Sequence, residues 1–362
     1  MLQTHRENAG VLHRKNVDML RHTNRAVMNW LFFFAAIVTF LVVFGGFVRL
    51  TRSGLAITEW NPISGTLPPL GGQAWLIEFD KYQQTPEYQQ INFGMTLKEY
   101  QYIFYIEWLH RFIARFAGLM YAIPAFYFLF TKKIPFKEFG IYFLMGMLFI
   151  AQAFAGWIMV ASGLVDRPSV SHFNLTIHLL LALALLGLAL WTAFGHKYGF
   201  PDNSEKAKWS LPSKLALVSF ILLIIQITYG GMTAGLKAGH VADTWPLMFG
   251  KLIPPNLFSS WINLFEVPQT IVFVHRWFAW LGILIVPAVY FVAKKQNYPR
   301  EILNGLLWLS AAVALQITLG VLTVLSYVNI VIALIHQANA LLLFALGIYF
   351  IHRLRALDVT RA

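Results

Sequence analysis

The uncharged stretch MNWLFFFAAIVTFLVVFGGFV (residues 28–48) decides the fold class of this chain. About 20 apolar residues are enough for a helix to cross a hydrocarbon core of roughly 30 Å. Similar stretches recur near 109–130, 139–161, 172–194, 214–234, 271–293, 302–326 and 330–352. The 362 residues are 58% hydrophobic and 12% charged. The pattern predicts an all-α integral membrane protein with eight transmembrane helices.

Basic residues indicate the orientation, because lysine and arginine collect in cytoplasmic connections. One side of the predicted spans holds 18 of the 28 basic residues: Arg6, Arg14, Lys15, Arg21, Arg25, Lys132, Lys133, Lys137, Lys197, Lys206, Lys208, Lys214, Lys294, Lys295, Arg300, Arg353, Arg355 and Arg361. Both termini are therefore expected in the cytoplasm. This bias accounts for the net charge of +12, so no nucleic-acid partner is expected.

The N-terminal stretch favours a bacterial cytoplasmic (inner) membrane over the mitochondrial inner membrane. It is basic but carries Glu7 and Asp18, and no apolar segment with a cleavage site follows, so it resembles neither a signal nor a transit peptide. The chain has no cysteine. This excludes disulfides, Fe–S clusters, thiolate-ligated haem and covalent c-type haem attachment.

The chain also repeats itself. GGFVRLTRSG (45–54) ends the first span and GGMTAGLKAG (230–239) ends the fifth, an offset of 185 residues. Trp60 and Trp245 share this offset. Further matches at smaller offsets pair His110–Arg111 with His275–Arg276, Gln152 with Gln316, Gly156 with Gly320, and His178 with His336. Four spans per half leave both halves in the same orientation. The sequence thus predicts two parallel-repeat four-helix bundles related by a pseudo-twofold axis along the membrane normal.

This repeat sets the expected domain boundaries. They are a cytoplasmic tail (1–27), a first half (28–194), a cytoplasmic linker (195–213), a second half (214–352) and a C-terminal tail (353–362). The first half contains a long outer loop, 49–108. Two short amphipathic helices, over 75–90 and 95–111, are expected to form a cap over the outer face of this half.

Four histidines lie near the outer ends of predicted spans: His110, His178, His275 and His336. An intramembrane histidine is a candidate functional residue because its burial in lipid is costly. A single one is more often a hydrogen-bonded core residue. Two matched pairs at one depth favour axial ligands for two haems, one in each bundle. Zinc is a weaker alternative, because the pairs lack further ligands at metal spacing apart from Glu107.

The remaining histidines are expected to be solvated, because they lie in tails, loops or at helix ends: His5, His13, His22, His172, His196, His240 and His352. Outer-side arginines fit the haem hypothesis, because guanidinium binds carboxylates such as haem propionates in bidentate fashion. Arg49, Arg111 and Arg276 are the candidates. The alternatives are snorkelling at the interface or pairing with nearby acidic residues.

Glu107 breaks the symmetry between the halves. It lies three residues before His110, on the same helix face, and the second half has Val272 at the matching position. A partly buried carboxylate beside one histidine pair suggests that the halves have different tasks, with Glu107 accepting or donating protons. The alternative is a structural pair with Arg111 or Arg115.

The motifs GGFVRLTRSGLAITEWNPISGTLPP, FDKYQQTPEYQQIN, EWLHR and MVASGL resemble the haem A synthase family. The similarity runs from about Arg21 to His352 and is closest to the mitochondrial and proteobacterial branch. Some bacterial members carry an outer-loop cysteine pair, which this chain lacks. The four histidines match the family's haem-ligand positions.

The resemblance implies oxidation of the C8 methyl of haem O to a formyl group by two successive hydroxylations, giving haem A. His275 and His336 would hold a resident haem b. His110 and His178 would receive haem O, and Glu107 would match the family's important carboxylate. Haem O synthase, an electron donor and a homo-oligomeric state are left open as partners.

Two other classes of function compete with this interpretation. A di-haem b electron-transfer protein would stack its haems on opposite sides of the membrane, whereas these histidines lie toward one side. A transporter would place polar residues at the midplane. Only Gln152, Gln226 and Gln316 are candidates, and glutamine near glycine is more simply explained by hydrogen bonds between close-packed helices.

Overall fold

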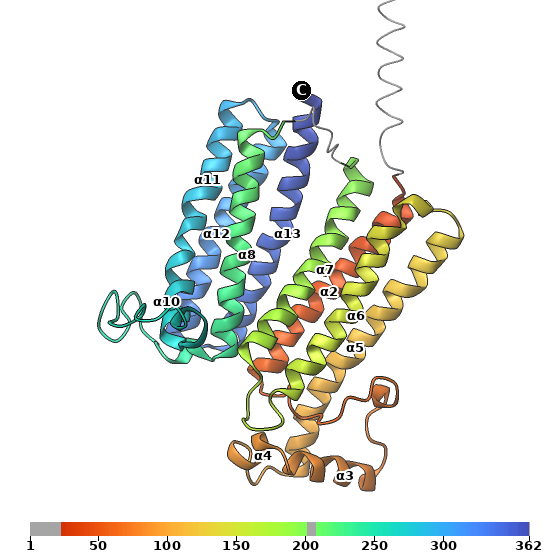
Figure 1. Cartoon of the computed structure of the whole chain (residues 1–362), viewed down its shortest axis with the longest axis vertical. Coiled ribbons are helices and arrows are strands. Elements are labelled where there is room, and N and C mark those ends of the chain that lie inside the picture. The colour runs from red at the N-terminus through yellow and green to blue at the C-terminus, as the bar shows by residue number, and fades with distance from the viewer. Residues whose placement is uncertain (1–22, 201–207, 362) are drawn as a thin grey trace, which may run out of the picture.

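A computed structural model describes residues 23–200 and 208–361 (Figure 1). Within these ranges the chain is helical, without a β-strand. Eight helical spans are long and apolar enough to cross a membrane, which confirms the predicted fold class. They are α2 (Arg25–Leu50), α5 (Leu97–Phe130), α6 (Phe139–Ala161), α7 (His172–Tyr198), α8 (Leu211–Gly235), α10 (Pro268–Phe278) with α11 (Trp280–Lys295), α12 (Arg300–Leu325) and α13 (Ile330–Arg361).

Figure 1 shows these spans as two groups. Helices α2, α5, α6 and α7 form the first group, and α8, α10 with α11, α12 and α13 form the second. Helix α7 packs against both α8 and α13, and α2 also contacts α13. The groups correspond to the two predicted halves. The pseudo-twofold axis between them stays a prediction.

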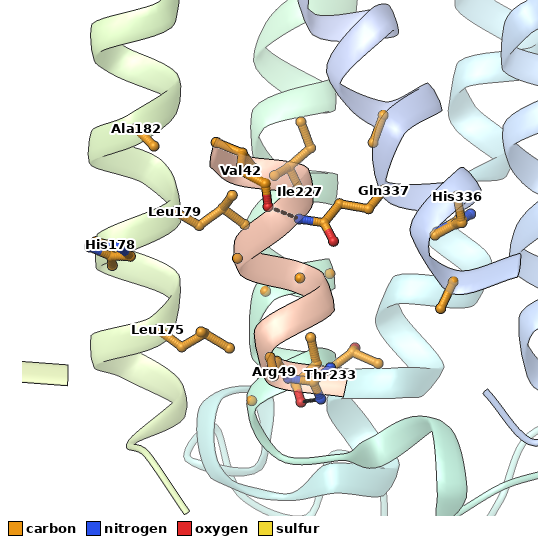
Figure 2. A pocket seen from close by; sticks show the side chains of 18 of the residues that line it. Val42, Arg49, Leu175, His178, Leu179, Ala182, Ile227, Thr233, His336 and Gln337 are labelled. Carbon is orange, nitrogen blue, oxygen red and sulfur yellow. Dashed lines mark hydrogen bonds between the residues drawn. The ribbon is translucent and has the colours of Figure 1, made fainter. Parts of the chain in front are cut away.

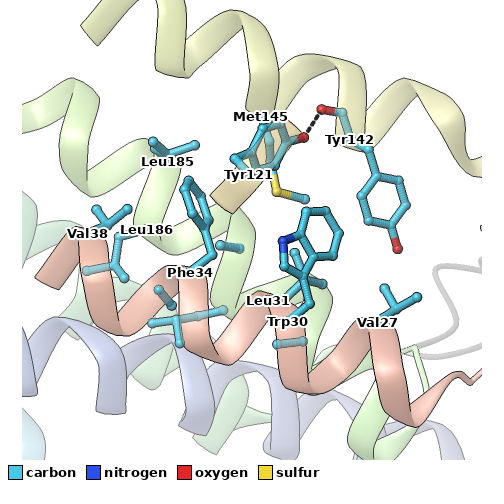
Figure 3. Close-up of a cluster of buried hydrophobic side chains, with 14 of the residues drawn as sticks. Val27, Trp30, Leu31, Phe34, Val38, Tyr121, Tyr142, Met145, Leu185 and Leu186 are labelled. Atoms are coloured by element: carbon cyan, nitrogen blue, oxygen red, sulfur yellow. Dashed lines mark hydrogen bonds between the residues drawn. The ribbon is translucent and has the colours of Figure 1, made fainter. Parts of the chain in front are cut away.

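The core of the first group is rich in aromatic side chains (Figure 3). Trp30 and Phe34 of α2 pack against Tyr121 of α5. The indole of Trp30 donates to the carbonyl of Met120 at 2.8 Å, and the Tyr121 hydroxyl donates to the carbonyl of Tyr142. Lipid tails are as apolar as this core, so close packing and these hydrogen bonds hold the helices together.

Helix α5 begins at Leu97, well before the predicted start of the second span. A capping box begins it: the Thr96 hydroxyl accepts from the Glu99 amide, and the Glu99 carboxylate accepts from the Thr96 amide at 2.8 Å. This reciprocal pairing satisfies two amides at the helix start. The prediction of a separate short helix over 95–111 is therefore wrong. Most of that segment is the outer part of α5.

The other predicted helix of the outer loop is present as α3 (Gly72–Gln83) and α4 (Pro86–Gln90). These helices pack on the start of α5 through a buried cluster that includes Trp75, Tyr82 and Tyr100. The Tyr100 hydroxyl lies 3.2 Å from the carbonyls of both Ala56 and Glu78. We call α3, α4 and the start of α5 the cap. It lies at the end of the first group opposite the C-terminus (Figure 1).

The sixth span is broken, although the sequence predicts one helix over 271–293. Helix α10 ends at Phe278 and α11 begins at Trp280. In a regular helix the amide of Ala279 would donate to the carbonyl of His275. Here it donates to the Trp277 carbonyl instead, so the His275 carbonyl has no helical donor. The Gln226 side chain donates to that carbonyl at 2.8 Å. This contact matters because an unpaired backbone group is costly within a membrane.

The last helix continues beyond the predicted span. Helix α13 extends to Arg361, so the predicted C-terminal tail is helical almost to its end. Within it, Arg355 forms an ion pair with Asp358 at 3.3 Å. Asp358 also accepts from the Tyr298 hydroxyl at 3.0 Å and from the Ser210 amide at 3.1 Å. These contacts fasten the end of α13 to the starts of α8 and α12.

The predicted N-terminal tail and the predicted linker lie partly outside the residues that the structure describes. Residues 1–22 of the predicted N-terminal tail and 201–207 of the predicted linker lie outside the described residues. Helix α2 begins at Arg25 and α7 continues to Tyr198. Both helices therefore extend a few residues beyond the predicted spans.

The prediction of solvated histidines is wrong for three residues. His172, His196 and His352 are buried. His172 lies 2.8 Å from the carbonyl of Phe265 in the other half, His196 lies 2.8 Å from the Tyr142 hydroxyl, and His352 packs against aromatic rings. His240 is exposed as expected. His5, His13 and His22 lie outside the described residues.

Candidate functional site

A single cavity of about 860 Å³ brings together every candidate site residue. This volume lies toward the upper end of the range of roughly 300–1,000 Å³ for small-molecule sites. The cavity extends across both halves, and part of it is shown in Figure 2. The candidate residues that line it are Arg49, Glu107, His110, Arg111, His178, His275, Arg276 and His336.

Each of the four histidines faces a glycine on a neighbouring helix. A Cβ atom on these glycines would lie 3.3 Å from His110 (Gly45), 2.9 Å from His178 (Gly156), 3.0 Å from His275 (Gly230) and 3.2 Å from His336 (Gly320). Glycine thus gives each imidazole room to lie close to the adjacent backbone. These glycines occupy the matched positions of the sequence repeat, so the same contact occurs at both pairs.

The second histidine pair has a geometry suited to one shared metal. The ring centroids of His275 and His336 lie 6.4 Å apart, and their planes are inclined by 83°. Two imidazoles whose nitrogens each lie about 2 Å from a metal have centroids about 6 Å apart. The two rings approach from α10 and α13. The separation therefore fits two imidazoles that would bind one iron between them.

The first pair, His110 and His178, comes from α5 and α7 and lines the same cavity. His178 lies across the cavity from His336, with α2 between them (Figure 2). Its Nε2 is 3.3 Å from the amide nitrogen of Gln152. Its Nδ1 is buried without a hydrogen-bond partner.

Glutamines contact three of the four histidines. Gln226 approaches Nδ1 of His275 at 3.0 Å, and Gln316 approaches Nε2 of His336 at 3.4 Å. Nδ1 of His336, like that of His178, is buried without a partner. An unpaired buried polar atom is costly, and a metal ligand bond is one way to remove that cost. The sequence predicted that these glutamines form hydrogen bonds between helices. They do so, and the side chains that they contact are the candidate histidines.

These observations make the residues a good fit for haem. Each half offers two imidazoles from separate helices, a glycine behind each ring and a largely apolar cavity. In each half one histidine also has a glutamine contact and an unpartnered ring nitrogen. A side chain that hydrogen-bonds to a metal-binding histidine without touching the metal fixes the orientation of the ring. The glutamines are placed to do this. The sequence revealed the imidazoles but not this role of the glutamines.

Glu107 is buried, with 3% of its surface exposed. Its Oε1 lies 2.6 Å from Nη2 of Arg111, and its Oε2 accepts from the backbone amide of Ile57 at 2.9 Å. The structural alternative raised by the sequence, a pair with Arg111, is therefore present. The pair also lines the cavity next to His110. This hydrogen-bonded carboxylate is thus held in a fixed position within the site.

Arg111 and Arg276 bind backbone carbonyls of the outer loops. Arg111 donates to the carbonyls of Ile57 and Glu59 at 3.1 and 3.3 Å. Arg276 donates to the carbonyls of Ala242 and Thr244, which match Ile57 and Glu59 in the repeat. Each arginine therefore anchors the loop of its own half. Sequence reasoning missed this role, because backbone acceptors leave no residue signature.

Arg49 joins the two halves. Its guanidinium donates to the backbone carbonyl of Ala234, the residue that matches Arg49 itself in the second half. Figure 2 shows Arg49 beside Thr233 at one end of the displayed pocket. The predicted binding of propionates by Arg49, Arg111 and Arg276 stays a prediction.

Glu87 of the cap is a buried carboxylate that sequence reasoning did not single out. It lines the same cavity and accepts from the Tyr82 hydroxyl at 3.3 Å. Burial raises the pKa of Glu87 to about 7. The residue lies in a polar segment, PEYQQ, where a carboxylate is normally solvated, so the sequence carried no signal of its burial.

The fold and site define a polytopic membrane protein with two pairs of partly buried histidines facing one cavity. The chain belongs to the COX15-CtaA family of cytochrome oxidase assembly proteins, whose profile matches residues 28–348. It is 41% identical to a protein named "Heme A synthase" from Wolbachia pipientis wMel, over 91% of this chain and 93% of the relative.

Similarity to other relatives of the same name is almost as high. The protein from Flavobacterium johnsoniae is 39% identical over 92% of this chain and 99% of its own length. The protein from Nitrosospira multiformis is 40% identical over 94% of this chain and 97% of its own length. The predicted family is thereby confirmed.

Proposed function

We propose that this chain is a haem A synthase, an enzyme that oxidises the C8 methyl of haem O to the formyl group of haem A. Membership of the family and the name shared by its relatives support this function. The observation that carries it is the pair of duplicated histidine sites in one cavity. A cavity lined by two histidine pairs suits an enzyme that uses one haem to modify another.

The two halves are proposed to hold different haems. The second half would bind a resident haem b through His275 and His336, whose rings lie 6.4 Å apart. The first half would bind haem O through His110 and His178. Glu107 supports this division, because the second half has Val272 at the corresponding position. A carboxylate is needed only where protons leave the reacting methyl group.

The chain's own residues would position the substrate and handle protons. When bound, haem b supplies one-electron redox chemistry. His110 and His178 would hold the substrate iron and thereby set the position of the methyl group. The carboxylate of Glu107 would accept a proton at Oε1 or Oε2, while Arg111 and the Ile57 amide stabilise its charge. The cap would limit the access of water.

The arginines are proposed to act at the edge of the macrocycles. Arg49, Arg111 and Arg276 line the cavity, and a guanidinium has five donors. Arg276 uses two of its nitrogens for loop carbonyls, while its Nε is buried without a partner. These groups support binding of the propionates of a haem whose acidic edge faces outward.

The chain is an integral membrane protein, and we propose the bacterial inner membrane with both termini in the cytoplasm. The start of α2 and the end of α13 lie opposite the cap (Figure 1). The distribution of basic residues supports a cytoplasmic position for that side. The cap and the haem sites would then lie toward the periplasmic side. Haem O synthase, an electron donor and further copies of the chain are the proposed partners.

The decisive test is production of haem A from haem O. The full chain is expressed with and without a haem O synthase, and the extracted porphyrins are identified by mass. Hydroxylated haem O and haem A are expected only when haem O is supplied. Bound haem b without either product would instead support the alternative, a di-haem b electron-transfer protein.

A further inference from the structure

Three positions near the histidines differ systematically between the halves. The second half has amide side chains at Gln226, Gln337 and Asn339. The repeat offsets of 185 and 158 residues match these to Leu41, Leu179 and Leu181 of the first half. An amide buried in a membrane needs partners, because an unpaired polar group in an apolar environment is costly. The partners of these amides therefore indicate why they are present.

Gln226 holds His275 from α8. Its amide donates to the His275 carbonyl at 2.8 Å and lies 3.0 Å from the ring Nδ1. The carbonyl is available because the sixth span breaks at Ala279. The side chain of Leu41 at the matching position has no amide, so His110 contacts only the backbone of this residue, and α5 continues unbroken past His110.

Asn339 holds His336 through Gln316. The Asn339 amide donates to the Ala312 carbonyl at 3.0 Å and to Oε1 of Gln316 at 2.7 Å. The amide of Gln316 in turn donates to the His336 carbonyl at 3.1 Å. This series of hydrogen bonds ends on a backbone carbonyl at each side, and a carbonyl only accepts hydrogen bonds. The orientation of both amides is therefore determined.

The first half lacks this arrangement. Gln152 approaches His178 at 3.3 Å, but its Oε1 is buried without a partner. Leu181 stands where an asparagine would bind that oxygen. The side chain of Gln152 therefore has no second contact to hold its amide in one orientation, and His178 is less constrained than His336.

We infer that Gln226 and Asn339 are positioning residues that make the second half the haem-retaining site, while leucine at the matching positions lets the first half release its haem. This inference rests on the proposed function of the two sites. An enzyme that modifies a haem must keep one macrocycle and exchange the other. Hydrogen bonds that orient metal-binding histidines commonly change metal affinity about 10- to 100-fold.

The test measures how fast bound haem leaves the purified full-length holoprotein. Gln226→Leu and Asn339→Leu each introduce the residue found in the first half. An excess of apomyoglobin captures released haem, and its absorbance gives the first-order rate. We expect each variant to lose haem b about 10- to 100-fold faster than the parent.

Gln337→Leu is the matched control. It also removes an amide where the first half has leucine, but Gln337 donates to the Val42 carbonyl at 2.8 Å rather than to a histidine (Figure 2). The rate of haem loss from this variant is expected to stay within about threefold of the parent, since it keeps both histidine contacts. If Gln226→Leu, Asn339→Leu and Gln337→Leu all lose haem at the same rate, whether fast or slow, the inference is overturned.

A spectroscopic measurement separates positioning from loss of stability. The anisotropy of the low-spin ferric EPR signal depends on the angle between the two imidazole planes, which is 83° at His275 and His336. Gln226→Leu and Asn339→Leu are expected to shift or broaden this signal before any haem is lost. An unchanged signal in both variants would contradict a positioning role.

The converse variant keeps the inference testable if the leucine variants do not fold. Leu181→Asn supplies the missing partner for Gln152 and is expected to increase the haem O that stays bound after exposure to apomyoglobin. No increase would count against the inference. The parent's production of haem A is measured in the same cells, so failure of the proposed function is distinguished from failure of this inference.

Discussion

The two halves of the molecule use one framework for two different environments. Both place a glycine behind each histidine, and both anchor their outer loop through an arginine that follows the first histidine. They differ in what surrounds that framework. The first half has Glu107 and a cap, whereas the second has two further amides, Gln226 and Asn339, that hold its histidines directly or through Gln316. Duplication thus preserved the contacts that shape the site and changed those that determine its chemistry.

The largest difference between the halves should appear when one histidine is removed, first from one half and then from the other. His275→Ala is expected to leave the purified protein without haem b, whereas His110→Ala should retain haem b but form no haem A. Each change deletes a proposed iron ligand, so the loss of affinity should exceed the roughly 100-fold effect of losing an orienting partner. Haem content per protein and the mass of extracted porphyrins distinguish the variants. The reverse pattern would exchange the roles of the halves.

The acidic position provides the next comparison. Glu107→Gln keeps the volume of the side chain but removes its charge and its ion pair with Arg111. Haem A formation is expected to fall by about 10²- to 10⁴-fold, the usual contribution of a general base, with haem b retained. Undiminished haem A would remove Glu107 from the mechanism.

Val272→Glu is the reciprocal control for Glu107. It places a carboxylate four residues before Arg276, whose Nε is buried without a partner, so the new charge has a cation beside it. The new carboxylate is expected to compete with the propionates of haem b for Arg276, so the variant should lose haem b more readily while the haem O site stays intact. Unchanged retention of haem b would count against propionate binding by Arg276.

Glycine replacements should have smaller effects. Gly156→Ala would place a Cβ 2.9 Å from His178, and Gly320→Ala would place one 3.2 Å from His336. Overpacking of this kind typically costs about 1–3 kcal/mol, so each should weaken binding in its own half, with the larger effect at Gly156. Gly140→Ala, with nothing within 4 Å of the new atom, is the control. Haem affinity measured by titration tests the order.

The pH dependence of the cap should be the smallest effect. Burial raises the pKa of Glu87 from its ordinary value of 4.5 to about 7. The folded cap therefore binds this proton more tightly than the unfolded segment does, and its stability falls as the pH rises through about 7. Hydrogen exchange over 72–92, corrected for its intrinsic pH dependence, should show less protection at about pH 8 than at about pH 5. Glu87→Gln should abolish the difference.

The sequence predicted the spans and the four histidines because both depend on residue type alone. Long apolar stretches indicate membrane helices, and matched imidazoles remain visible across a duplication. The outer part of α5 was predicted as a separate helix over 95–111, because its polar residues lie outside the apolar stretch that marks the second span; Thr96 and Glu99 carry the capping signal at its true start. The break at Ala279 was missed because no proline or glycine marks it, and a tertiary contact from Gln226 pairs the freed carbonyl.

The interactions of the arginines and amides were beyond sequence reasoning for a different reason. Arg111 and Arg276 bind loop carbonyls, and every residue has a carbonyl, so no pattern predicts which one is used. Asn339 acts on His336 only through Gln316. Such an indirect contact depends on how three helix positions are arranged in space.

The unbroken length of α5 has a mechanical consequence. One helix carries Tyr100 of the cap and then His110 with no break between them, and its internal proline, Pro124, lies beyond both. A movement of the cap would therefore reach the His110 imidazole without a loop to absorb the displacement. The interruption at Ala279 separates α10 from α11, so His275 lies on a short helix of its own.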